Sequence, residues 1–218
     1  MVITMKIRAI VPIKLNNERF PNKNLALLGG VPLCTHLLTT LSKIDEIDTY
    51  VYCSSDSILS YLPNGIKFFK RSPELDHFSV KRQQIVSSML RDLPSDIYVY
   101  AHVTNPFLTE KSIRSAIQAV AQEGYDSAIG VTAHQKYIWY KNEPINFDTK
   151  NLLRTQDIEP VYMEMGLFVF RHEVAIRNGS VYGKNRKLIP VTEVEAVDID
   201  YKEDLDFANL LLAQKGIK

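Results

Sequence analysis

The chain has 218 residues, of which 45% are apolar, enough for one sizeable hydrophobic core in a single domain spanning residues 1–218. With 26 basic and 25 acidic side chains the formal net charge is +1, which gives no reason to expect a nucleic acid or an anionic membrane surface as partner. Cys34 and Cys53 have neither metal-ligand nor disulfide spacing. The first residues do not resemble a secretory signal, and no apolar run is long enough to span a bilayer, so we expect a cytoplasmic protein.

Strand and helix patterns alternate along most of the chain. Short apolar runs rich in β-branched residues predict strands at 7–13, 48–54, 66–70, 97–103, 128–132, 166–170 and 196–200. Apolar stripes at helical spacing predict helices at 33–41, 80–90, 109–120 and 205–212, the third capped by Thr109. This alternation predicts a three-layer α/β/α sandwich.

Residues 134–165 have a different character. They contain Trp139, three tyrosines, Pro144 and Pro160. Their apolar residues follow neither the spacing of a helix nor that of a strand over any long stretch. We therefore expect loops and short hairpin strands that form a small projecting segment within the domain.

The loop after the first strand carries three cations, Lys14, Arg19 and Lys23, together with several amides. It follows the carboxyl end of a strand, where open α/β sheets bind ligands. Cations and backbone N–H groups are what a triphosphate needs around its oxygens. On charge alone, however, a solvated basic turn explains this segment better.

The order of residues in this loop resembles the nucleotide loop of the acylneuraminate and Kdo cytidylyltransferases, commonly A-R-x-x-S-K/T-R/G-x-P-x-K-N. The matching positions are Arg19, Pro21, Lys23 and Asn24, and Lys14 stands where the family usually has Arg. The resemblance implies that Lys14, Arg19 and Lys23 hold the phosphates of CTP and that Asn24 lies near the nucleotide. Asn16 and Asn17 replace the usual Gly-Ser pair, and we expect Asn16 at the nucleotide as well. Glu18 occupies a position that is often Lys.

Two later segments continue the match. Arg71-Ser-Pro-Glu-Leu75 is similar to the family's R-P-x-E-L, whose Arg approaches the nucleotide. The segment from His102 to Phe107 resembles L-Q-P-T-S/N-P, with His102 in place of Gln. An imidazole nitrogen can still bond the nucleotide, although a strand-end histidine with a backbone partner is an equal alternative. Residues 78–81 replace the usual D-x-A-S. Lys81 and Arg82 could face an anionic ligand or solvent, and of the two we expect solvent.

A pair of carboxylates near the end of the chain is the strongest chemical signal. On a strand, Asp198 and Asp200 would point to the same side, and such neighbours repel unless a cation lies between them. Magnesium suits this pair, but D-x-D alone also describes an exposed edge strand. The segment resembles the family's S-I-D-I-D-T-x-x-D-L, which implies that Asp198 and Asp200 bind Mg²⁺. We expect Glu203 and Asp204 to serve the following helix.

Two further segments resemble the parts of the family that bind the sugar. They are residues 155–166, which look like the family's R-Q-D-x-P-x-x-Y-x-E-N-G, and a loop at 182–184. The sugar-binding residues that this resemblance implies are Gln156, Tyr162, Glu164 and Tyr182. Lys136 or Lys141 would bind the sugar carboxylate, and Lys141 is our choice. The resemblance also implies a homodimer in which 134–165 packs across the subunits, although its aromatic residues could equally be core of the same subunit.

Taken together, the resemblance implies a Rossmann-like nucleotidyltransferase fold with a mostly parallel mixed sheet. The activity it implies joins CTP to an acidic 2-keto-3-deoxy sugar of the sialic, pseudaminic or legionaminic type. One alternative is the same chemistry on another acceptor, such as a sugar phosphate. Another is a non-catalytic relative, which Glu18, Phe78 and His102 favour. A nicotinamide-dependent reductase is disfavoured because the first loop has no G-x-G-x-x-G.

Overall fold

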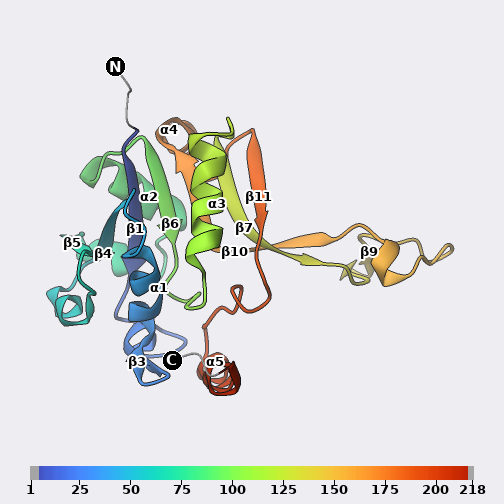
Figure 1. Cartoon of the computed structure of the whole chain (residues 1–218), viewed down its shortest axis with the longest axis horizontal. Helices are drawn as coiled ribbons and strands as arrows, with labels where there is room; N and C mark the ends of the chain where they lie inside the picture. Colours follow the sequence, from blue (N-terminus) through green and yellow to red (C-terminus); the bar gives the residue numbers. More distant parts are fainter. Residues whose placement is uncertain (1–4, 216–218) are drawn as a thin grey trace.

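A seven-stranded sheet forms the centre of the protein in the computed structural model, which describes residues 5–215 (Figure 1). Its strands are β1 (Ile7–Ile13), β4 (Asp48–Cys53), β5 (Lys67–Lys70), β6 (Ile97–Ala101), β7 (Ser127–His134), β10 (Val161–Arg171) and β11 (Arg186–Pro190). They lie in the order β11-β7-β10-β6-β1-β4-β5. Strand β10 is antiparallel to both of its neighbours and the other pairs are parallel. The sheet is therefore mixed and mostly parallel, as predicted.

Helices cover both faces of this sheet. They are α1 (Leu33–Leu41), α2 (Arg82–Asp92), α3 (Glu110–Ala121), α4 (His172–Asn178) and α5 (Lys202–Lys215). Helices α1 and α3 share one apolar core with the sheet, and α2 and α4 share the core on the opposite face. Helix α5 closes a third, smaller core beside the short hairpin of β2 (Leu27–Leu28) and β3 (Val31–Pro32). The three-layer α/β/α sandwich is confirmed.

The central strands are apolar on both sides, which is why their sequences show no polar alternation. In β1, Ala9 and Val11 pack in the core under α1 and α3, whereas Ile10 packs in the core under α2 and α4. All three side chains are fully buried. A strand covered by helices on both faces needs apolar residues at successive positions.

The predicted strand at 196–200 is wrong. Residues 197–200 belong to no helix or strand, and Ile199 N–H donates one backbone hydrogen bond, of 2.8 Å, to the Thr104 carbonyl. The alternation of Asp198, Ile199 and Asp200 nevertheless separates the side chains as a strand would, because Ile199 is fully buried while both carboxylates face a pocket. The alternating pattern predicted correctly which side chains are buried and which face the pocket, but the segment does not pair with any strand.

Two features of the sheet were not predicted. Strand β10 extends well beyond the predicted 166–170, and β11 was missed. Strand β11 is an edge strand that pairs with β7 alone and carries Arg186 and Lys187 in place of a continuous apolar run. Charges on an edge strand discourage pairing with other chains. They also interrupt the apolar run by which the other strands were predicted, so the sequence pattern did not indicate β11.

Between β7 and β10 the chain leaves the sheet as a long arm (Figure 1). The far part of the arm carries the hairpin of β8 (Trp139–Tyr140) and β9 (Glu143–Pro144), joined by Lys141 and Asn142. Both turn residues have positive φ, 49° and 65°, as a two-residue type I′ hairpin turn requires. The rings of Tyr137 and Trp139 pack on Phe147, with centroids 4.9 and 5.2 Å apart. The chain between β7 and β10 thus projects from the sheet, whereas Met165, at the end of the range 134–165, packs in the main core.

No helix within residues 5–215 combines the length and the apolar character that crossing a bilayer would require.

Gly166 in β10 packs closely against the segment that follows β6, so a substitution there measures how tightly the two are packed. A methyl group added at Gly166 would lie 2.8 Å from His102 Cβ and would also collide with the side-chain oxygen of Asn105. We predict that Gly166→Ala lowers the free energy of unfolding by about 1–3 kcal/mol, the usual cost of overpacking. Chemical denaturation measures this change. A loss below about 0.5 kcal/mol would mean that this edge of the sheet yields easily.

Candidate active site

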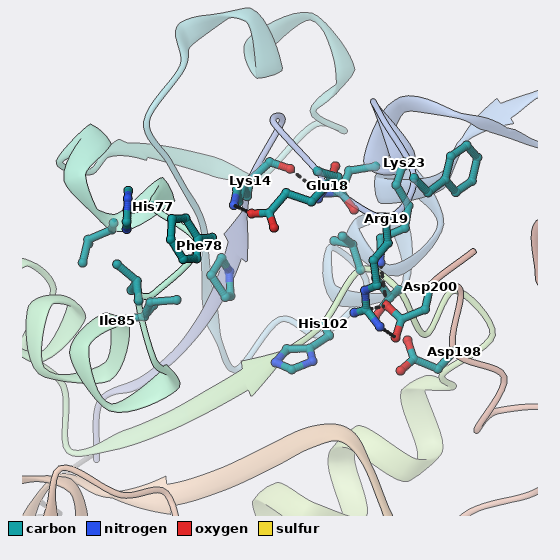
Figure 2. A pocket seen from close by; sticks show the side chains of 18 of the residues that line it. Lys14, Glu18, Arg19, Lys23, His77, Phe78, Ile85, His102, Asp198 and Asp200 are labelled. Carbon is teal, nitrogen blue, oxygen red and sulfur yellow. Dashed lines mark hydrogen bonds and ion pairs between the residues drawn. The ribbon is translucent and has the colours of Figure 1, made fainter. Parts of the chain in front are cut away.

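A pocket of about 600 Å³ opens at the carboxyl ends of the central strands (Figure 2). Four segments that lie far apart in the sequence line it. They are the loop after β1, the segment from Arg71 to Ile85 after β5, residues 100–104 at the end of β6, and the pair Asp198 and Asp200. Open α/β sheets bind their ligands at this edge.

The loop after β1 is closed on itself by polar contacts. The side chain of Asn24, which is 5% exposed, donates a hydrogen bond of 2.7 Å to the carbonyl of Lys14, so the start and the end of the loop are tied together. The ammonium of Lys14 lies 3.3 Å from Glu18 Oε1. Glu18 therefore partly neutralises Lys14. Asn17 lines the pocket, whereas Asn16 is exposed and is not among the lining residues.

Asp200 joins this loop to the end of the chain. Its two carboxylate oxygens lie 2.9 and 2.8 Å from the Arg19 guanidinium, and Lys23 Nζ is 2.8 Å from Oδ1 (Figure 2). The Lys23 side chain is only 9% exposed, so its pair with Asp200 is shielded from water. The structure thus brings together Lys14, Arg19, Lys23, Asn24, Asp198 and Asp200, which the sequence predicted to share one site.

The two aspartates differ in their electrostatic surroundings. Burial raises the pKa of the Asp198 carboxyl, and the nearby charge of Asp200 adds to this rise. Burial also acts to raise the pKa of Asp200, but hydrogen bonds and positive charge from Lys23 and Arg19 outweigh it and lower that pKa below its ordinary value. Asp200 is therefore held as a carboxylate by its cations.

The pair Asp198 and Asp200 suits a magnesium ion. Magnesium is usually held by one or two carboxylates, with substrate phosphates and water completing its shell. Within residues 5–215 no group of three or more His, Cys, Asp or Glu side chains is placed to hold a metal without such help. Burial outweighs the Thr104 hydrogen bond and the charge of Lys23, so the pKa of Asp198 is raised, and a dication beside it would stabilise its charged form.

Side-chain hydrogen bonds fix the segment that carries these aspartates. Asp204 Oδ2, in the first turn of α5, accepts from the backbone N–H groups of Asp200 and Tyr201 at 2.9 and 2.8 Å. Asn105, fully buried, donates to the Val197 carbonyl at 3.1 Å and accepts from Gly166 N–H at 3.1 Å. The expected role of Asp204 at the start of the helix is thereby seen in detail.

Glu195 is the third anchor of this segment and is 6% exposed. Its Oε1 accepts from the Thr109 hydroxyl and the Ser112 hydroxyl, both at 2.6 Å, and from Thr109 N–H at 3.1 Å. Its Oε2 accepts from the N–H and the hydroxyl of Thr192, both at 3.1 Å. Burial acts to raise the pKa of Glu195, but these hydrogen bonds prevail and lower it. The carboxylate ties the loop to the N-terminus of α3, where Thr109 is the N-cap as predicted.

Arg71 and His102 line the floor of the pocket. Arg71 is 3% exposed and pairs with Asp76 at 2.5 Å, while its Nε and Nη1 atoms are buried without a hydrogen-bond partner among the described residues. Burial, with the charges of Arg82 and Lys23, lowers the pKa of His102 to about 4. His102 is therefore a neutral imidazole near pH 7, packed edge-on against Tyr100 with ring centroids 5.2 Å apart.

Two of the predicted sugar-binding residues meet beyond His102. The hydroxyl of Tyr182 donates to Glu164 Oε2 at 2.6 Å, and Arg82 lies 2.9 Å from the Tyr182 oxygen and 3.3 Å from Glu164 Oε1. The Arg82 guanidinium also lies over the Phe168 ring, 4.5 Å from its centroid. The expectation that Arg82 faces solvent was wrong. The opposite charges of Arg82 and Glu164 could have indicated an ion pair, but the two residues are 82 positions apart, so no sequence pattern placed them together.

None of the predicted sugar-binding residues lines this pocket within one chain, and Tyr182 lines a separate, smaller pocket together with Arg82. Gln156 and Tyr162 are exposed on the arm, and Lys141 occupies the turn between β8 and β9. None of the three is among the residues that line the pocket.

The sequence singled out Phe78 only as a departure from the family pattern, and it did not predict that Phe78 and its neighbours line the site. Leu75, His77, Phe78, Val80 and Ile85 line the pocket, and Figure 2 shows His77, Phe78 and Ile85 together on one side of it. Because residues 78–81 depart from the family pattern, no motif pointed to them.

Glu195 provides a stability prediction with a definite pH dependence. Glu195→Ala leaves several buried donors without an acceptor, so we predict a loss of about 2–4 kcal/mol in the free energy of unfolding at pH 7. Because the folded-state pKa of Glu195 is lowered, its contribution is present above its unfolded pKa of about 4.3 and is lost as pH falls through the folded-state value. The difference in the free energy of unfolding between wild type and Glu195→Ala should therefore become smaller below about pH 4.

Glu193→Ala is the matched control, since Glu193 lies on the same loop with its side chain 71% exposed. Its expected effect is within about 0.5 kcal/mol. Urea unfolding at several pH values measures both variants. Equal losses for the two glutamates would contradict an anchoring role for Glu195.

Known proteins resemble the chain over almost its whole length. N-acylneuraminate cytidylyltransferase A of Danio rerio is 25% identical over 221 residues, which cover 96% of this chain and 51% of that protein. Pseudaminic acid cytidylyltransferase of Campylobacter jejuni is 25% identical over 223 residues, covering 95% of this chain and 96% of the relative. The chain spans about half the length of the N-acylneuraminate cytidylyltransferases that it matches.

Solved structures share the fold. The structure of CMP:2-keto-3-deoxy-manno-octonic acid synthetase complexed with CTP superposes with a TM-score of 0.72 at 14% identity, covering 96% of this chain and 99% of the other. The 4-diphosphocytidyl-2C-methyl-D-erythritol synthase of Anaerococcus prevotii gives a TM-score of 0.67 at 16% identity, covering 96% and 97%. The model of the cytidylyltransferase family matches residues 8–217, and the chain belongs to that family.

Proposed function

We propose that this protein is a magnesium-dependent cytidylyltransferase that joins CTP to an acidic 2-keto-3-deoxy sugar and releases pyrophosphate. The observation that carries the proposal is the meeting of the cationic loop after β1 with Asp198 and Asp200 in one pocket. A nucleoside triphosphate needs positive side chains at its phosphates and carboxylates for its metal ion. Relatives over nearly the whole chain carry the names of N-acylneuraminate and pseudaminic acid cytidylyltransferases.

In the proposed reaction, the anomeric hydroxyl oxygen of the sugar attacks the α-phosphorus of CTP. The bond from that phosphorus to the bridging oxygen breaks, pyrophosphate leaves with the electron pair, and the hydroxyl proton passes to water. Arg19 and Lys23 exchange their contact with Asp200 for the phosphates, and with Lys14 they stabilise the leaving group. A magnesium ion on Asp198 and Asp200 would neutralise phosphate charge and polarise the attacking hydroxyl.

The acceptor would lie on the side of His102 where Arg82, Glu164 and Tyr182 meet. These side chains offer a guanidinium for a carboxylate, and a carboxylate and a phenol for sugar hydroxyls. An acidic, hydroxyl-rich sugar matches this set of donors and acceptors.

A homodimer is part of the proposal. The arm exposes apolar side chains that a single chain leaves in water: Trp139, Tyr140, Ile145, Leu152, Leu153, Tyr162 and Met163. Exposed aromatic residues gathered on one projection favour an interface. A second subunit would also account for Lys141, Gln156 and Tyr162, which lie away from the pocket of their own chain.

A screen of pyrophosphate release tests the substrate class. We predict release with CTP and a nine-carbon sugar acid in the presence of magnesium, and at least about tenfold less with UTP or GTP. Release with CTP and a sugar phosphate, but with no sugar acid, would reassign the acceptor. Wild-type protein that neither binds CTP nor releases pyrophosphate would contradict the proposed function.

Asp200→Ala tests the acidic pair. It removes one proposed metal ligand and leaves Lys23 and Arg19 without their partner, so we predict that turnover falls at least about a hundredfold. Asp206→Ala is the control, because Asp206 is an exposed aspartate of α5 that pairs with Lys202 on the surface. It should keep near wild-type turnover. Near-normal rates for Asp200→Ala with magnesium would remove Asp200 from the mechanism.

A further inference from the structure

The pocket has two chemically distinct sides. In Figure 2, Arg19, Lys23, Asp198 and Asp200 gather on one side, and His77, Phe78 and Ile85 lie on the other, with His102 between them. The first side suits phosphate and metal. The second consists of aromatic and aliphatic carbon and therefore suits a flat or apolar part of a ligand.

Phe78 is the unusual member of the apolar side. Its side chain lines the pocket, yet it is 73% exposed, the most exposed of the large apolar residues that the structure describes. It belongs to none of the apolar cores formed by the described residues. A phenylalanine left in water forgoes the stabilisation of burial, so its position is unexplained by folding alone.

The segment around Phe78 is ordered by local contacts. The His77 and Phe78 rings lie against each other, with centroids 4.3 Å apart. His77 Nδ1 is 2.8 Å from the Ser79 hydroxyl, and Val80 N–H donates to the His77 carbonyl at 3.1 Å. The turn therefore holds the His77 ring in place behind Phe78 before any ligand arrives, which reduces the entropic cost of binding.

We propose that Phe78, supported by His77, is the platform on which the pyrimidine base of the nucleotide stacks. The inference rests on the proposed function, since it assumes a nucleotide substrate. Of the two substrates, only the nucleotide has a flat unsaturated ring, and aromatic side chains stack on the faces of bases. The acceptor is saturated and rich in hydroxyls, and the polar group of Arg82, Glu164 and Tyr182 serves it better.

Phe78→Ala, studied by calorimetry, separates stacking from phosphate binding. With CTP as the probe, we expect the dissociation constant to rise about tenfold or more, as for loss of one base–aromatic stack. With inorganic triphosphate, which has no base, the dissociation constant should stay unchanged. Phe207→Ala is the matched control, because Phe207 is 54% exposed on α5 and does not line the pocket. This control should bind CTP as the wild type does.

Phe78→Trp provides a second measurement that does not depend on a loss of function. We expect it to bind CTP at least as tightly as the wild type and to show fluorescence quenching with CTP, but not with triphosphate, beyond the signal of the single native Trp139. Unchanged CTP affinity of Phe78→Ala, or an equal loss for CTP and triphosphate, would overturn the platform while leaving the proposed function intact. Wild-type protein that binds triphosphate but not CTP would overturn both.

Discussion

The contact of Asp200 with Arg19 and Lys23 is the interaction on which the site depends. Asp200 is 181 positions from Arg19 and 177 positions from Lys23, and within residues 5–215 no strand pairing links the two segments. The ion pair closes the pocket between the first loop and the segment before α5. The same contacts place the positive charges of Arg19 and Lys23 against the carboxylate of Asp200. Under the proposed function, the phosphates of a nucleotide would take over these contacts when it binds.

Holding Asp200 in place requires a scaffold that the sheet itself does not provide. Residues 197–200 do not pair with a strand. Hydrogen bonds from side chains therefore hold this segment in place of the backbone hydrogen bonds of a sheet. Glu195 fastens the segment to α3, Asn105 fastens it to β10 through Gly166, and Asp204 fixes its end at α5. Three separate elements, α3, β10 and α5, thus constrain one short segment. Buried, fully bonded polar groups of this kind favour one conformation over its neighbours.

Much of the fold and of the charged part of the site was predictable from the sequence, because both depend on local patterns. Apolar runs marked the buried strands, and the order of residues in the loop after β1 marked the cations that line the pocket. The missed features depend on long-range contacts or on exposure. Strand β11 was missed because its charges suit an edge. Arg82 was missed because its partner Glu164 lies in a distant segment, and Phe78 because a single exposed aromatic residue has no periodic signal.

His102 has a consequence for how the protein tolerates acid. An imidazole usually changes charge near neutrality, but with a pKa of about 4 this ring stays uncharged down to acidities at which carboxylates themselves begin to titrate. A histidine in place of the glutamine of the family pattern therefore adds no charge to the pocket near neutral pH. Mild acidification of the surroundings therefore adds no charge at the His102 ring itself.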